Sequence, residues 1–119
     1  MAKHVFIVLT NAAAGKEDAY NDWYTNTHIP DVLNVPGVVA AQRFTLSADQ
    51  RAAPPHPYKY LAVYEIETDD LKGMLAILNE RAGTSAMVIS DAIDQTRLAW
   101  IYAPVTERIE AAHRGAAGS

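Results

Sequence analysis

The chain has 119 residues and a formal net charge of −4, with half of its residues apolar and a fifth charged. These proportions are typical of one globular domain and exclude a disordered chain. The lysines and arginines are scattered, so we expect no nucleic-acid partner. The absence of cysteine excludes disulfides, zinc–thiolate sites and thiol nucleophiles. The apolar run at residues 5–9 is too short for a signal-peptide core or a membrane span, which predicts a cytoplasmic protein without a membrane partner.

The first predicted element is a strand over residues 3–11, which is rich in β-branched and aromatic side chains. Its apolar run is almost continuous, so we expect both faces of the strand to be covered. Because side chains alternate along a strand, Phe6 and Val8 belong to one face, and Val5 and Ile7 belong to the other.

A helix is predicted from about residue 16, with acidic residues in its first turn. Pro30 lacks an amide hydrogen and disfavours helix at residue 29, so the helix should end or bend there. A turn over residues 34–37 then leads into a second strand over residues 38–46. The helical positions that share one face are Ala19, Tyr20, Trp23, Tyr24, Thr27 and His28.

The second half of the chain predicts a strand, a helix and a strand. The proline-rich stretch 47–57 is an exposed connection, and residues 58–67 alternate as a third strand with tyrosines on one side. A second helix opens at Leu71 and ends near Gly83. Residues 84–93 are ambiguous and include a further helical turn as one option. The last strand begins at residue 94 or 95 and ends at residue 102.

This order predicts a ferredoxin-like α+β fold, βαββαβ, with a four-stranded antiparallel sheet and both helices on one face. We expect one domain over residues 1–105 and a C-terminal tail over residues 106–119. The other face of the sheet would be a bare apolar patch, and such patches usually mark an interface, so a homodimer is expected. The residues predicted to line that face are Phe6, Val8, Tyr60, Tyr64, Trp100 and Tyr102.

Residues 23–38 combine an aromatic helix end, a His-x-Pro at His28 and a Pro-Gly at Pro36 that leads into the second strand. This stretch resembles the EthD-like branch of the dimeric α/β-barrel superfamily. The resemblance implies a sheet that pairs with a second subunit, and a cavity between sheet and helices. It also implies a role for His28, because enzymes of that branch tend to use this histidine. The superfamily includes isomerases, cyclases, decarboxylases, cofactor-free monooxygenases and haem-binding proteins, so fold alone does not select an activity.

His28, Tyr24 and Asp31 are the candidate catalytic residues. A helix C-terminus raises a histidine pKa and burial lowers it, so the pKa of His28 could lie near neutrality, where a general acid or base works best. The alternative is that His28 only caps the last carbonyls of its helix. Asp31 either caps the next turn or reaches His28 and fixes its tautomer.

A second group of residues is predicted to bind a small apolar or aromatic ligand. Tyr60, Tyr64 and Trp100 could form a flat wall with hydroxyl donors, although they would serve equally well in a dimer core. Arg43 would anchor a substrate carboxylate or form an interface salt bridge. The full set is Phe6, Trp23, Arg43, Tyr60, Tyr64 and Trp100.

No metal site or cofactor is predicted, because the four histidines lie on different elements and no nucleotide-binding pattern occurs. Three functions remain open. The first is a cofactor-independent isomerase, cyclase or decarboxylase acting on a small aromatic or carbonyl compound with His28 as general acid or base. The second is a non-catalytic binding or stress-related protein. The third is a haem-dependent or cofactor-free oxygenase.

Overall fold

A computed structural model describes residues 1–112, and its elements follow the predicted order. Residues 113–119 of the expected tail, with His113, lie outside the described residues. The elements are β1 (Lys3–Thr10), α1 (Glu17–Trp23), the π-helical turn η1 (Tyr24–His28), α2 (Ile29–Leu33), β2 (Val38–Thr45), β3 (Tyr60–Glu67), α3 (Leu71–Arg81) and β4 (Leu98–Tyr102).

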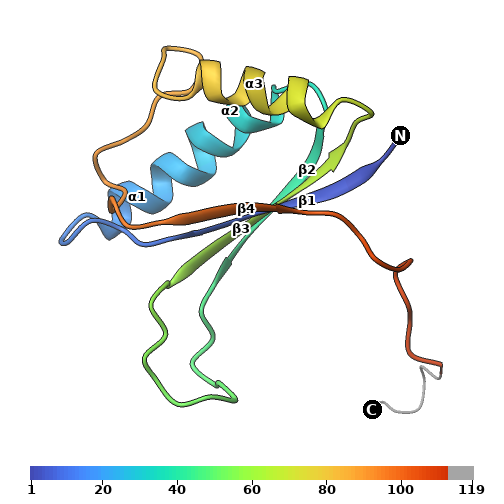
Figure 1. Cartoon of the computed structure of the whole chain (residues 1–119). Coiled ribbons are helices and arrows are strands. Elements are labelled where there is room, and N and C mark those ends of the chain that lie inside the picture. Colours follow the sequence, from blue (N-terminus) through green and yellow to red (C-terminus); the bar gives the residue numbers. More distant parts are fainter. Residues whose placement is uncertain (113–119) are drawn as a thin grey trace.

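The four strands form one antiparallel sheet in the order β2-β3-β1-β4. Figure 1 shows α1, α2 and α3 together on one side of this sheet. The predicted ferredoxin-like α+β fold is therefore confirmed. Within residues 1–112, no helix is both long enough and apolar enough to cross a bilayer.

The register of the sheet corrects the prediction about its faces. Phe6 lies opposite Tyr64 and Ile101, and these side chains pack in the core under the helices. Trp100 lies opposite Ile7, one residue out of step with Phe6, and therefore belongs to the uncovered face. The residues predicted to share the bare face thus divide between two faces: Phe6, Val8, Tyr60 and Tyr64 face the helices, whereas Trp100 and Tyr102 do not.

The uncovered face is apolar all the same. Trp100 is 55% exposed on it, and Tyr102 is 51% exposed. A contiguous apolar surface of this kind usually marks an interaction site. Its apolar side chains, which lie opposite one another in the register, are Val5, Ile7, Leu9, Phe44, Leu61, Val63, Leu98, Trp100 and Tyr102.

The first helical run continues through Pro30, where the sequence predicts an end or a bend. A proline ring clashes with the carbonyl four residues earlier, which here belongs to Asn26 inside η1. The π turn relieves this crowding because Ile29 donates its amide hydrogen to the Tyr24 carbonyl, five residues back. Helix α2 follows directly, so His28 lies within a helical run and not at its end.

The aromatic face of this run forms the centre of the core. Tyr20, Tyr24 and Tyr64 are each no more than 1% exposed and fill the space between helix and sheet. Tyr20 meets the Tyr24 ring edge-on with centroids 5.6 Å apart, and Phe6 packs on Tyr64 with the same centroid separation. Rings of this size bury the most apolar surface per residue, so they carry much of the stability of the domain.

The connection from α3 to β4 contains no helix, although one further turn was an option for residues 84–93. It is held by isolated bridges, such as the one between Ala82 and Met87, and Met87 is buried in the core. Strand β4 begins at Leu98, later than the predicted residue 94 or 95.

Gly37 makes the turn between α2 and β2 possible. Its φ of 101° lies in the region that side-chain-bearing residues avoid, and its carbonyl accepts the Glu67 amide hydrogen at 2.8 Å. A Cβ at this position would lie 3.4 Å from Met74 Cγ and from Thr68 Cβ. These are ordinary contact distances, so it is the backbone conformation that requires glycine here.

Replacing Gly37 with alanine should therefore destabilise the domain by about 1–2 kcal/mol, because a side chain is strained at this φ. Gly15→Ala, where φ is 74° and nothing lies within 4 Å of the added Cβ, should cost a similar amount. Urea unfolding of both variants measures the two losses, and an unchanged stability of Gly37→Ala would contradict the backbone argument.

Candidate functional site

Helix α1 and the turn η1 carry the aromatic group that contains the predicted catalytic residues. Tyr20, Trp23, Tyr24 and His28 recur at helical spacing, which turns them to the same side of the run. Trp23 also fastens the connection to β4, because its indole N–H donates to the Val88 carbonyl at 3.1 Å. Three of the predicted site residues are thus brought together by one helical face.

His28 is held between two aromatic rings. It stacks on Trp23 with centroids 4.8 Å apart and an interplanar angle of 28°, and it meets the Tyr24 ring edge-on at 4.9 Å. Its Nδ1 atom is buried and has no hydrogen-bond partner. An unpaired buried nitrogen is costly, and such atoms in folded proteins call for an explanation.

Burial, together with the smaller effect of the positive charge of Arg97, lowers the pKa of His28 from 6.5 to about 4. The expected value near neutrality is corrected here. It assumed a helix C-terminus at His28, and the continuation into α2 removes that negative end. At neutral pH the imidazole is uncharged, so it can accept a proton but has none of the imidazolium needed for a general acid.

The neighbouring tyrosines remain protonated. Tyr64 donates a hydrogen bond to the Tyr24 hydroxyl at 3.3 Å. Burial raises the pKa of Tyr24 to about 12 and raises the pKa of Tyr64 above its ordinary value. Among residues 1–112, the Tyr24 hydroxyl accepts this hydrogen bond and donates none of its own.

Arg43 lies on β2 beside the same aromatic group. Its guanidinium carbon is 4.6 Å from the centroid of the Tyr24 ring and 5.4 Å from that of Tyr60. Its Nη1 donates to Thr25 Oγ1 at 2.8 Å, and its Nη2 donates to Asn21 Oδ1 at 2.9 Å. The guanidinium is therefore fixed by two neutral acceptors and by aromatic rings.

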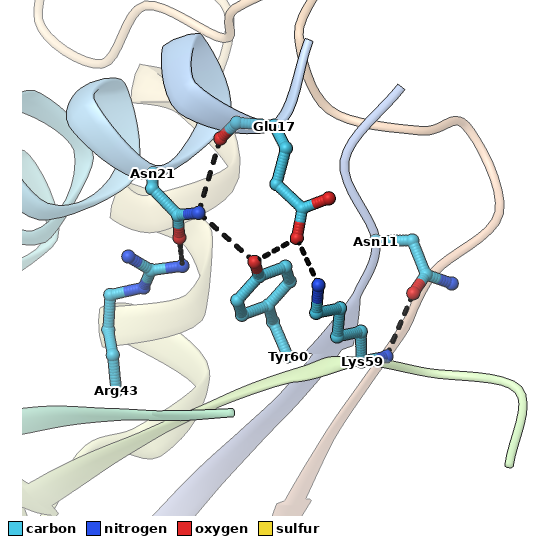
Figure 2. A network of polar contacts seen from close by, with 6 residues as sticks. All are labelled: Asn11, Glu17, Asn21, Arg43, Lys59 and Tyr60. Atoms are coloured by element: carbon cyan, nitrogen blue, oxygen red, sulfur yellow. Dashed lines mark hydrogen bonds and ion pairs between the residues drawn. The ribbon is translucent and has the colours of Figure 1, made fainter. Parts of the chain in front are cut away.

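A polar network extends from Asn21 along the helix (Figure 2). Asn21 Nδ2 donates to the Tyr60 hydroxyl at 3.1 Å, and Tyr60 in turn donates to the Glu17 carboxylate. Lys59 pairs with the same carboxylate, and its backbone N–H donates to Asn11 Oδ1 at 2.8 Å. Hydrogen bonds from Lys59 and Tyr60 lower the pKa of Glu17, so this acid remains charged and occupied.

Two predicted site residues lie apart from this group. Asp31 begins the first turn of α2, but its carboxylate neither caps that turn nor bonds His28, so both expected roles are corrected. Trp100 lies on the opposite face of the sheet and cannot join the wall formed by Tyr60 and Tyr64. The π turn explains why Asp31 caps nothing, because a continuous helical run needs no side-chain cap at its middle.

The sequence interpretation missed the polar side of the helix. Glu17 was noted only as a first-turn acid, and Asn21 and Thr25 were assigned no role. These three follow one another at four-residue spacing and form a stripe that faces β2 and β3. That spacing was the available signal, although it gave no indication of Arg43 as its partner.

Two of the surface hollows within residues 1–112 have volumes of about 1040 Å³ and about 700 Å³. Residues 103–109 and the neighbouring parts of β1 and β3 line the larger one, and the β2–β3 connection lines the smaller one. Neither is lined by His28, Tyr24 or Arg43. Within residues 1–112, no three histidine, aspartate or glutamate side chains gather in a way that could hold a metal ion.

No protein-family model matches the sequence, and no curated protein matches it either. The fold is similar to an EthD-like protein from Ralstonia eutropha JMP134, with a TM-score of 0.63, 16% identity, and coverage of 91% of this chain and 96% of that one. A monooxygenase-like protein from Shewanella loihica PV-4 gives a TM-score of 0.59 at 16% identity, and the match covers 89% of this chain and 97% of that one. The fold is also similar to the haem degrader MhuD from Mycobacterium tuberculosis, which has two haems bound in its active site. The TM-score is 0.57 at 16% sequence identity, and the match covers 88% of this chain and 98% of that one. The EthD-like resemblance is thus confirmed at the level of the fold.

The position of His28 predicts a measurable effect of pH. The folded pKa of about 4 lies below the ordinary 6.5, so the unfolded chain binds the proton more readily. The stability contributed by the neutral imidazole is complete above pH 6.5 and is lost as the pH falls from 6.5 to 4, by about 3 kcal/mol. Urea unfolding of the native protein and of His28→Gln across this range should show a slope that the variant lacks. Parallel curves would place the imidazole in a solvated environment and contradict the geometry.

Proposed function

We propose that this protein is a cofactor-independent enzyme that moves a proton on a small aromatic or carbonyl compound, with His28 as the general base. The observation that carries the proposal is the buried, neutral imidazole with an unpaired Nδ1, packed edge-on against the Tyr24 ring. A perturbed titratable group near hydrogen-bond donors is the usual composition of an acid–base site. Isomerisation, cyclisation and decarboxylation all belong to this chemistry.

The proposed step begins with a C–H bond next to a carbonyl group. Nδ1 of His28 takes the proton, and the electron pair of that bond moves to the carbonyl oxygen and forms an enolate. The Tyr24 hydroxyl donates a hydrogen bond to the developing oxyanion, as its raised pKa keeps it protonated. Return of the proton to another carbon completes an isomerisation. Substrate access requires the connection over residues 82–97 to open. Besides the Trp23 hydrogen bond, backbone hydrogen bonds from Ala13 to Ala92 and from Asp94 to Asn11 hold that segment, and Met87 anchors it in the core.

A haem-dependent function is less well supported by the residues present. The space between helices and sheet is filled by Tyr20, Tyr24 and Tyr64, which a porphyrin would have to displace. His28, the histidine beside that space, is enclosed by two aromatic rings. These residues do not fit a haem, and we derive no step through one.

The test uses phenylpyruvate in D₂O as a probe, with exchange of its benzylic hydrogens followed by NMR. The native protein should accelerate this exchange over buffer, and His28→Gln should lose about a hundredfold or more of that acceleration. The rate should be constant above pH 5 and fall below it, since protonation removes the base. His56→Gln, on the exposed β2–β3 connection, is the matched control and should retain full activity. A native rate equal to buffer would favour the non-catalytic binding function instead.

We further propose that the protein is a homodimer joined through the uncovered face of the sheet. The partner is a second copy because that face and the C-terminal arm offer matching apolar surface. The arm comprises residues 103–112, which follow β4, and it runs away from the sheet in Figure 1. Val105 is 97% exposed and Ile109 81% exposed, so the arm packs little on its own chain. The hollow between arm and sheet gives a second copy room to dock.

Trp100→Glu should separate the subunits, since it places a charge at the centre of the proposed interface. Light scattering at micromolar concentration should give twice the chain mass of 13.0 kDa for the native protein and a single mass for the variant. Val88→Glu changes an equally exposed apolar residue in the connection before β4 and should leave the dimer intact. A native protein that scatters as one chain would contradict the proposal.

A further inference from the structure

The charge of Arg43 has no acidic partner among the described residues. Its two hydrogen bonds go to Thr25 and Asn21, which are both neutral. Glu17, the acid of the adjoining network, is already paired with Lys59 and bonded by Tyr60. A half-buried guanidinium in a chain of net charge −4 would normally be neutralised by a carboxylate.

The guanidinium is also fixed in place before any ligand arrives. Its carbon lies 5.3 Å, 4.6 Å and 5.4 Å from the ring centroids of Tyr20, Tyr24 and Tyr60, respectively. Two of its five N–H donors are used, which leaves three. Three donors suffice for a bidentate contact with a planar carboxylate. Figure 2 shows that Asn21 bonds both Arg43 and Tyr60, while Tyr60 and Lys59 occupy the Glu17 carboxylate.

We propose that Arg43 binds the carboxylate of a small aromatic acid at the edge of the sheet. This deepens the proposed function by assigning its substrate class, and it rests on that function. Tyr60 is half-buried and its ring centroid lies 5.4 Å from the guanidinium carbon, so this tyrosine would provide an aromatic contact to such a ligand. Arg43 and His28 both lie within 5 Å of the centroid of the Tyr24 ring, so an acid held by Arg43 lies next to the ring that packs on the proposed base.

The alternative partner for Arg43 is a carboxylate from a second subunit. Arg43 lies opposite Ala62 in the register, and Ala62 is buried under the helices. The guanidinium therefore belongs to the helix side of the sheet, and the face proposed for the dimer is the other one. This geometry favours a small ligand over an interface salt bridge.

The test is calorimetric titration of the full-length protein with benzoate, and with benzamide as its uncharged counterpart. Benzoate should bind and benzamide should not. Arg43→Gln should weaken benzoate binding by about tenfold or more, because charge-assisted hydrogen bonds are lost, and Arg43→Lys should weaken it less. Arg51→Gln, in the exposed β2–β3 connection, is the matched control and should bind as the native protein does.

A measurement on the native protein keeps the proposal testable if Arg43→Gln fails to fold. Benzoate should shift the NMR amide signals of Asn21 and Thr25. No benzoate binding, equal binding of benzamide, or shifts confined to other elements would overturn the proposal. The result is separate from that of the deuterium-exchange experiment, since binding at Arg43 and turnover at His28 are measured independently.

Discussion

The structure depends on the packing of one aromatic helical face against β1 and β3. Tyr20 and Tyr24 fill the space over the sheet, and Tyr20 fixes its hydroxyl on that of Thr10 at the end of β1. Burying these rings contributes a large share of the apolar stabilisation available to a domain of this size. The π turn keeps the face continuous past Tyr24, because it lets the helix pass Pro30 without losing contact with the sheet.

The same packing determines the charge state of every group beside it. Exclusion of water keeps the imidazole of His28 neutral and the hydroxyls of Tyr24 and Tyr64 protonated. Arg43 is the exception, since a guanidinium stays charged in any protein environment. The site thus combines uncharged donors and acceptors with the positive charges of Arg43 and Arg97, a composition suited to stabilising a developing anion and not a cation.

The sequence predicted the fold well because the order of elements depends on local patterns. The alternation along β3 and the aromatic spacing of α1 are both local. The prediction of the sheet face on which Trp100 lies was wrong. That face depends on which β4 residue lies opposite Ile7, and a shift of the register by one residue reverses the assignment. The pKa of His28 was misjudged because the helix was expected to end at Pro30, and only the three-dimensional backbone reveals that it continues. Arg43 was predicted as a binding residue, but its partners come from α1 and η1, and no local pattern in the sequence relates them to Arg43.

Strand β2 contributes side chains both to the helix-covered face of the sheet and to its uncovered face. It is an edge strand, with Arg43 turned to the helices and the next residue, Phe44, turned to the uncovered face. Any partner that covers Phe44 therefore restrains the backbone that carries Arg43, and with it the guanidinium against Tyr24. Rigid placement of a binding group improves affinity by reducing the entropy lost when the ligand binds. A partner bound to the uncovered face would thus also order the helix side of β2, where we propose that Arg43 binds its ligand.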